Sequence, residues 1–356
     1  MKKIIAMLLV LIMATALFSA CAPQEQSGEL YIPVMAKGFQ HQFWQAVKKG
    51  SQDAAAKYGV DIYFAGPASE TEIDKQVEMI KTEMAKNPKA MALAALSTDA
   101  VKEILQECAD KNIPVIGFDS GVPGDTSGAL KATASTNNEN AAAIAATTFG
   151  EHADLVAAMK AATPENPVII GCLSQDAVSA SVVGRTTGFV NKMVEVAKAH
   201  GTVAVTGHDK WNSGDVASAS IIIEVAISAT TEATAVQTAA NALLAKENLI
   251  ALFCSNEGAV TGFLSAVSDG ADLAEGGKYH GLVVAGFDAG KAQKDAVRKG
   301  LFYGSVTQDP YRIGYLAVEL AVKAANGESV ADVDTGAQWY DASNIDNEDI
   351  ALLVYD

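Results

Sequence analysis

Short apolar runs alternate with longer stretches of helical periodicity from Leu30 onward. The short runs are rich in β-branched residues and read as buried parallel strands, whereas the stretches between them repeat apolar positions at helical spacing. This alternation predicts successive βα units around parallel sheets. The predicted strands are 30–35, 60–65, 90–96, 114–118, 132–135, 168–173, 221–228, 250–255, 282–287 and 304–307.

Helices are predicted between these strands. Gly59 is a typical C-terminal cap for the first helix, and Ser69 with Glu72 forms the pattern of a capping box at the start of the second. The predicted helices are 43–58, 70–86, 98–111, 182–199, 234–245, 260–267 and 291–299.

The segment 201–219 does not fit the alternation. We interpret it as an insertion at the amino edge of the second sheet, away from any ligand, because 221–228 is a β-branched run with better strand character. The alternative makes 203–206 the main strand and places Trp211 in a ligand cleft.

The two halves of the chain share a motif. Gly-Phe-Asp-Ser-Gly at 117–121 and Gly-Phe-Asp-Ala-Gly at 286–290 each follow an apolar run and lie about half the chain apart. This spacing indicates two copies of one α/β unit. Since ligands bind beyond the carboxyl ends of parallel strands, Asp119 and Asp288 are expected to face one crevice. The predicted fold is therefore two similar doubly wound parallel-sheet α/β domains facing a cleft.

The N-terminus has the pattern of an export signal. Lys2 and Lys3 precede an apolar run of 15 residues, 4–18, which is shorter than the roughly 20 residues of a spanning helix. Ser19-Ala20-Cys21 resembles a bacterial lipobox, in which the cysteine thiol receives diacylglycerol. We predict a signal peptide over 1–20, lipidation at Cys21 and a polar tether over 21–28; the alternative is ordinary cleavage with a free terminal cysteine.

The other three cysteines show no C-x-x-C spacing. Cys108 falls in a helical pattern, and Cys172 and Cys254 end apolar strands, so buried thiols are expected. The alternative is a disulfide between Cys172 and Cys254, which requires neighbouring strands with suitable Cβ geometry.

Composition and charge narrow the function. A chain of 356 residues with 49% hydrophobic residues can bury a large core, and its net charge of −16 disfavours nucleic acid and anionic membranes as partners. No nucleophile, phosphate-loop or zinc-protease motif occurs, and the five histidines are scattered. We predict no enzyme activity, no metal and no cofactor.

Aromatic side chains and side chains with paired hydrogen-bonding groups recur at the predicted strand ends. They are Lys37, His41, Phe43, Trp44, Asp119, Arg185, Asn256, Asp288 and Gln308. A sugar stacks its C–H faces on aromatic rings, and its neighbouring hydroxyls match carboxylate, amide and guanidinium groups, so a neutral polyol is expected. The alternatives are structural: Phe43 or Trp44 in the core, the aspartates as turn caps, and Asn256 and Gln308 as satisfied loop amides.

These segments together resemble the periplasmic sugar-binding proteins of the ribose/galactose type, which serve ABC importers. The resemblance is carried over essentially the whole mature chain by the order and spacing of 37–44, 113–120, 184–189, 254–257, 284–288 and 306–310. It implies the type I periplasmic binding protein fold with a hinge of three crossovers, near 134–138, 308–310 and 336–343. The implied lobes are 29–136 plus 309–337 and 137–308 plus 338–356.

The resemblance also implies the ligand and its contacts. The residues that it assigns to sugar contacts are Phe43, Trp44, Asp119, Arg185, Asn256, Asp288 and Gln308. The full set of predicted ligand-binding residues adds Lys37, His41, Ser120 and Asn137. Ser120 replaces the arginine of ribose binders, Ala94 and His41 replace asparagines, and 228–231 lacks the aromatic wall, so ribose itself is not the expected ligand.

The function implied is capture of an aldose by a monomeric lipoprotein held outside the cytoplasm, which delivers the sugar to a membrane permease. A receptor for a furanosyl signalling molecule or nucleoside shares this fold and is the main alternative. A transcription regulator of the lac repressor type would need a basic helix-turn-helix where this chain has its signal pattern.

Overall fold

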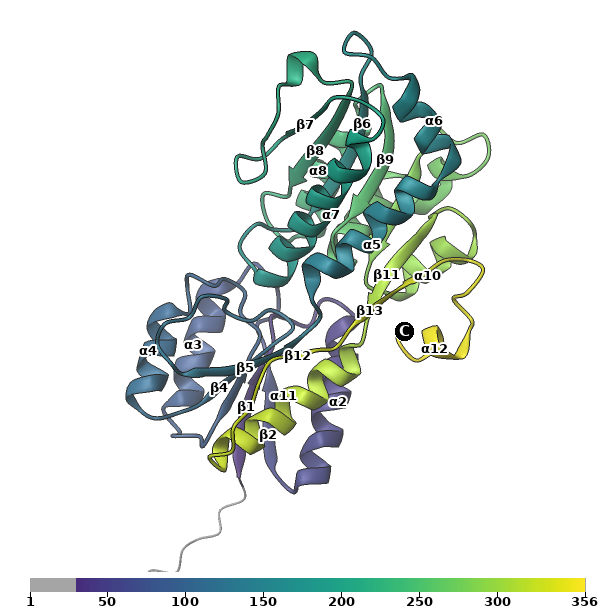
Figure 1. Cartoon of the computed structure of the whole chain (residues 1–356). Helices are drawn as coiled ribbons and strands as arrows, with labels where there is room; N and C mark the ends of the chain where they lie inside the picture. The colour runs from purple at the N-terminus through teal and green to yellow at the C-terminus, as the bar shows by residue number, and fades with distance from the viewer. Residues whose placement is uncertain (1–29, 356) are drawn as a thin grey trace, which may run out of the picture.

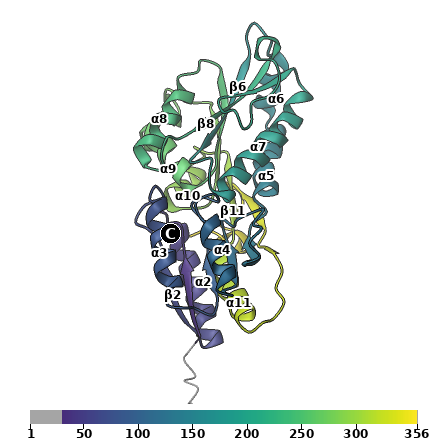
Figure 2. The ribbon, with the colours of Figure 1, turned by 90° about the vertical axis from the view of Figure 1, so that its left-hand side faces the viewer.

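The chain folds into two α/β lobes that lie end to end (Figures 1 and 2). The structure is a computed structural model that describes residues 30–355. The predicted signal peptide, Cys21 and the whole of the tether lie outside the described residues. Each lobe contains one largely parallel sheet, and both sheets have helices on their two faces. The predicted fold class is confirmed.

The N-terminal lobe contains a six-stranded parallel sheet in the order β12-β5-β4-β3-β1-β2. Its strands are β1 (Tyr31–Met35), β2 (Asp61–Ala65), β3 (Met91–Leu93), β4 (Val115–Phe118), β5 (Leu130–Ser135) and β12 (Val333–Asp334). Helices α2 (Phe43–Tyr58) and α11 (Pro310–Ala325) pack on one face, and α3 (Ile73–Met84) and α4 (Lys102–Asp110) on the other. A Cβ at Gly314 would lie 1.9 Å from the carbonyl oxygen of Val47, so the close crossing of α2 and α11 requires glycine.

The C-terminal lobe contains a seven-stranded sheet in the order β13-β11-β10-β9-β6-β8-β7, of which only β13 is antiparallel to its neighbour. Its strands are β6 (Val168–Ser174), β7 (Val203–Thr206), β8 (Ile221–Ile227), β9 (Leu249–Cys254), β10 (Val283–Phe287), β11 (Gly304–Gln308) and β13 (Ala337–Tyr340). Its helices are α5 (Asn138–Glu151), α6 (Ala153–Ala161), α7 (Ala180–Lys198), α8 (Ala233–Leu244), α9 (Glu257–Ala266) and α10 (Lys291–Arg298), with the short α12 (Glu348–Ala351) near the end.

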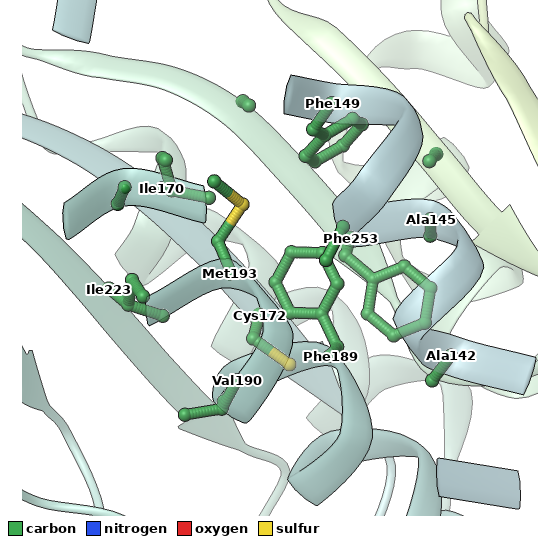
Figure 3. Packing of buried hydrophobic residues seen from close by; sticks show 14 of the residues in the cluster. Ala142, Ala145, Phe149, Ile170, Cys172, Phe189, Val190, Met193, Ile223 and Phe253 are labelled. Carbon is green, nitrogen blue, oxygen red and sulfur yellow. The ribbon is translucent and has the colours of Figure 1, made fainter. Parts of the chain in front are cut away.

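The core of this lobe lies on both faces of the sheet. Helices α5, α6 and α7 cover one face, and α8, α9 and α10 cover the other. Figure 3 shows Phe189 of α7 against Phe253 of β9, and the two rings stack with centroids 4.4 Å apart. Phe149 of α5 meets Phe189 edge-on, so three aromatic rings join two helices to the sheet.

The chain crosses between the lobes three times. It leaves β5 for α5 at 136–137, β11 for α11 at 309, and β12 for β13 at 335–336. The last crossing falls at the start of the predicted range 336–343, because β13 already belongs to the C-terminal sheet. Thr136 links the crossings: its hydroxyl contacts Gln308 Oε1 at 3.0 Å and Thr335 Oγ1 at 3.2 Å.

Several predicted elements differ in detail. Helix α3 starts at Ile73 instead of residue 70. Only half of the predicted capping box forms: the Glu72 carboxylate accepts from Ser69 N, but the Ser69 hydroxyl bonds the Thr71 hydroxyl instead of a backbone amide of the helix. Helices α5, α6 and α11 were not among the predicted elements. The alanine-rich sequence of α5 gives a weak helical pattern, because apolar residues occupy most of its circumference.

The segment 201–219 is not an insertion at the amino edge of the sheet. It forms the outer strand β7, which pairs in parallel with β8, and then returns along that edge. Trp211 packs in the core on the α7 side and donates from Nε1 to the Thr187 hydroxyl at 3.0 Å. The main-strand prediction for 221–228 therefore holds, and Trp211 lies away from the cavity between the lobes.

The three described cysteines are buried free thiols. Strands β6 and β9 are neighbours, but Cys172 pairs in register with Phe253, and Cys254 with Leu173. The two thiols therefore point to opposite faces of the sheet and belong to different core clusters. Burial raises the pKa of the Cys108 thiol to about 11, which keeps it in the unreactive protonated form. A Cys172–Cys254 disulfide is ruled out by this register.

Candidate functional site

A cavity lies between the lobes, at the carboxyl ends of β1, β4, β9 and β10. The free volume between its walls is about 20 Å³, so the side chains nearly fill it in this arrangement. Its lining combines three aromatic or imidazole rings with eight other ionisable or amide side chains from both lobes. The lining residues are Lys37, His41, Phe43, Trp44, Glu70, Asp119, Ser181, Val182, Arg185, Asn256, Glu257, Asp288 and Gln308. Strand ends of two parallel sheets therefore meet at one polar site.

Arg185 is the central cation of the C-terminal wall. It lies in the second turn of α7, because that helix begins at Ala180, two residues earlier than predicted. Its Nη1 lies 3.2 Å from Asp288 Oδ2, its Nε donates to Asn138 Oδ1 at 2.8 Å, and its guanidinium carbon lies 3.9 Å above the centre of the Phe287 ring. These three contacts fix the guanidinium plane of a side chain that lines the cavity.

Asp288 connects this wall to the hinge. Its Oδ1 accepts from Gln308 Nε2 at 2.7 Å, and Gln308 Oε1 accepts from the Thr136 hydroxyl. Its Oδ2 also accepts from Glu257 N at 3.0 Å. The residue has a φ of +75°, a conformation that Asp and Asn tolerate better than other side chains with a Cβ. A ligand held by Asp288 would thus contact a chain of hydrogen bonds that reaches the crossings.

Asp119 is the carboxylate of the opposite wall. It also has positive φ, +52°, and is only 4% exposed. Among the described residues, no donor hydrogen-bonds its carboxylate, and Arg185 Nη2 lies 3.9 Å away. Burial raises the pKa of Asp119 to about 6, although the charges of Lys37 and Arg185 act in the opposite direction. The carboxylate is therefore a buried acceptor that lacks a donor.

Lys37 and Glu70 form a second charged pair in the N-terminal wall. Lys37 Nζ lies 3.6 Å from Glu70 Oε2, and both side chains are at most 4% exposed. Burial by itself would lower the pKa of Lys37, but the charges of Glu70 and Asp119 outweigh it and raise the pKa. Burial would likewise raise the pKa of Glu70, but Lys37 holds it below its usual range. Both groups therefore stay ionised.

Polar contacts join the two lobes around the cavity. The Glu257 carboxylate of α9 accepts from the backbone amides of Gln42 and Phe43, at 3.2 and 3.3 Å, and so caps α2 across the cleft. In return, Gln42 Oε1 accepts from Lys291 N at the start of α10, at 2.8 Å. These reciprocal helix caps describe a closed arrangement of the lobes.

Most of the sequence-predicted residues lie around this one cavity. Ser120 and Asn137 do not line it. Ser120 is buried and its hydroxyl accepts from Ser181 N, while Asn137 is exposed and caps α5. The neighbouring Asn138 instead contacts Arg185. Phe43 and Trp44 both line the cavity and belong to the core, so neither alternative excluded the other.

Sequence reasoning missed Glu70 and Glu257. Residue 70 was assigned to the start of a helix, whereas it lies in the loop before α3, where its side chain is buried. Glu257 follows Asn256 in the segment 254–257, but its contact with α2 involves residues from the other half of the chain. Only the excess of acidic residues near strand ends could have indicated either residue.

Two other classes of feature are absent from residues 30–355. No group of histidine, cysteine or acidic side chains in this part of the chain is arranged to hold a metal ion. No helix there is both long and apolar enough to span a bilayer.

Comparison with known proteins places the chain in a family. Residues 32–329 match the model of the periplasmic binding protein domain. A Brachyspira murdochii structure described as "ABC transporter, LacI family transcriptional regulator" is 40% identical, with a TM-score of 0.78, covering 93% of this chain and all of that one. An ABC transporter solute-binding protein of Agrobacterium vitis with bound D-fucose is 25% identical, with a TM-score of 0.75, covering 91% of this chain and all of that one.

A curated relative agrees with these matches. The D-allose-binding periplasmic protein of Escherichia coli strain K12 is 23% identical over 310 residues, which are 86% of this chain and 88% of the relative. The family match covers most of the chain, and the lobes and the cavity between them have the corresponding architecture. The chain belongs to the periplasmic binding protein family.

Proposed function

We propose that the protein captures a monosaccharide in the cavity between its lobes and delivers it to an ABC importer. The observation that supports this most is the convergence of Asp119 and Asp288, from equivalent strand ends of the two lobes, on one guanidinium, that of Arg185. Carboxylate and guanidinium groups pair with neighbouring hydroxyls, and Phe43 and Trp44 offer apolar ring surface. The D-fucose bound to one relative and the description of another as D-allose-binding support the same ligand class.

In this mechanism the sugar stabilises lobe closure. An open form would expose the polar walls, and a ligand that contacts both lobes favours the closed form by its differential affinity. The closed form brings Glu257 to the N-terminus of α2 and Gln42 to that of α10. Because Gln308 lies at a crossing and bonds Asp288, ligand contact and hinge geometry are coupled directly.

Delivery and location follow from the same proposal. A permease would recognise the closed face formed by both lobes, and the protein acts as a binding protein without turnover. Cys21, with diacylglycerol on its thiol, would anchor the mature chain outside the cytoplasm, and the polar segment 21–28 would give it reach. Site residues proposed to contact the sugar are Lys37, His41, Phe43, Trp44, Asp119, Arg185, Asn256, Asp288 and Gln308.

The test is titration calorimetry with the purified protein. The panel is D-allose, D-fucose, D-arabinose, D-ribose and D-galactose, with adenosine as the nucleoside arm. Saturable binding of a monosaccharide at one site per chain is expected. No binding of any monosaccharide, or tight binding of adenosine alone, would overturn the proposal.

A further inference from the structure

Glu70 Oε2 is a buried carboxylate oxygen that lines the cavity and lacks a hydrogen-bond partner among the described residues. The other oxygen, Oε1, accepts from Trp44 Nε1 at 3.0 Å, which fixes the orientation of the carboxylate. The Glu70 backbone amide donates to Gln40 Oε1 at 2.8 Å, and a Cβ at Gly38 would come within 3.2 Å of Glu70 Cγ. The side chain is therefore held in place, with one acceptor left over.

Lys37 does not satisfy that acceptor by hydrogen bonding. Its Nζ is 3.6 Å from Glu70 Oε2, beyond the usual distance of a charged N–H···O bond. The two groups have opposite roles, because an ammonium only donates and an ionised carboxylate only accepts. A hydroxyl group does both, so a hydroxyl placed against the pair would satisfy each partner at once. A buried acceptor left without a donor is costly, and a ligand that supplies one gains that free energy.

We propose that Glu70 is a specificity-determining ligand contact, which accepts a hydrogen bond from a sugar hydroxyl that also accepts from Lys37. This inference rests on the proposed function and adds to it a residue that recognises one sugar hydroxyl by a hydrogen bond. The ring carbon that faces Glu70 and Lys37 must therefore carry a hydroxyl group, with its hydrogen directed to the Glu70 carboxylate. A substituent that cannot donate, such as fluorine or a methyl ether, leaves the carboxylate unpaired inside the closed cavity.

The test combines a conservative variant with ligand analogues. Glu70→Gln keeps the size of the side chain and an oxygen for Trp44 Nε1, but it turns an NH₂ toward Lys37 and the ligand. The matched control is Glu78→Gln, at an exposed residue of α3 whose carboxylate pairs with Lys75 on the surface. Titration calorimetry measures the dissociation constants of the panel sugar that binds best and of its monodeoxyfluoro analogues.

The expected result is selective loss of one recognition. Glu70→Gln raises the dissociation constant of the parent sugar roughly 10- to 100-fold, and Glu78→Gln leaves it unchanged. Fluorination at one carbon weakens binding to the wild type by roughly 10-fold or more but weakens binding to Glu70→Gln by less than about 3-fold. Such coupling cannot arise if Glu70 only orients Trp44.

Other outcomes overturn the inference. If the wild type binds the sugar and Glu70→Gln binds it with the same dissociation constant, the inference is overturned and the proposed function stands. The same conclusion follows if Glu70→Gln weakens binding of the parent sugar and of every fluorinated analogue by the same factor. No sugar binding by the wild type overturns both. If Glu70→Gln does not fold, Glu70→Asp serves the same series, since it keeps the charge beside Lys37 but withdraws the oxygen from the ligand.

Discussion

Replacement of Asp288 measures how much the network at the C-terminal wall contributes to the fold. Asp288→Ala removes the acceptor of Arg185 Nη1, of Glu257 N and of Gln308 Nε2. Loss of one partner of a buried ion pair costs about 3–5 kcal/mol. Alanine at a φ of +75° adds about 1–2 kcal/mol, because its Cβ crowds the backbone in this conformation.

Asp288→Asn separates these contributions. Asparagine tolerates the positive φ, its amide oxygen still accepts from Arg185 and Glu257 N, and its NH₂ donates to Gln308 once the Gln308 amide turns over. Only the charge assistance is lost, which costs about 1–2 kcal/mol. The ligand-free protein is unfolded in urea at pH 7 and followed by far-ultraviolet circular dichroism.

The control is Asp295→Asn, which removes one side of an exposed pair with Lys291 and is expected to leave the free energy of unfolding unchanged. The reasoning is refuted if Asp288→Ala and Asp288→Asn lower that free energy equally, or if Asp288→Ala lowers it by less than about 1 kcal/mol.

Three further predictions concern Asp119, Gly188 and Glu257. Because burial raises the pKa of Asp119 to about 6, its contribution to stability is greatest below pH 4 and is lost as the pH rises through 6. Asp119→Asn should abolish this loss of about 3 kcal/mol in the free energy of unfolding. Identical pH profiles of the unfolding free energy for the wild type and the variant would contradict the prediction. A Cβ at Gly188 would lie 2.1 Å from the Glu139 carbonyl oxygen, so Gly188→Ala should lower the melting temperature. At a helical site with open space around it, the same substitution would raise the melting temperature. A rise for Gly188→Ala would therefore contradict the close packing of α5 on α7. Glu257→Ala removes the cap of α2 across the cleft, so the sugar dissociation constant should rise roughly 5- to 30-fold in calorimetry with little change in melting temperature, and an unchanged constant would contradict the cap's role in closure.

The strands and the site edges could be predicted from sequence because parallel sheets bury continuous apolar runs. Strands β4 and β10 end in the repeated Gly-Phe-Asp motif, and this repeat alone placed Asp119 and Asp288 at equivalent edges. Both aspartates then need positive φ at the strand end, a constraint that turns their side chains into the cavity. A local pattern predicts such residues well, since the strand itself positions them.

The parts that sequence reasoning missed depend on contacts between distant segments. Glu257 caps a helix 214 residues away in sequence, at Phe43, and no local pattern reports that contact. Glu70 was predicted to be helical because Ser69 and Glu72 have the spacing of a capping box. In the structure these two residues instead belong to a loop, and α3 begins only at Ile73. The outer strand β7 was read as an insertion because its short run competes with the stronger run of β8.

The claim on which this account depends is that one sugar lies between the lobes and contacts both. A crystal structure of the protein grown with the best-binding monosaccharide tests it most directly. The account predicts one sugar in the cavity, with hydroxyl oxygens within hydrogen-bonding distance of both the Asp119 and Asp288 carboxylates. A sugar bound to one lobe only, or at any surface outside the cavity, would contradict it.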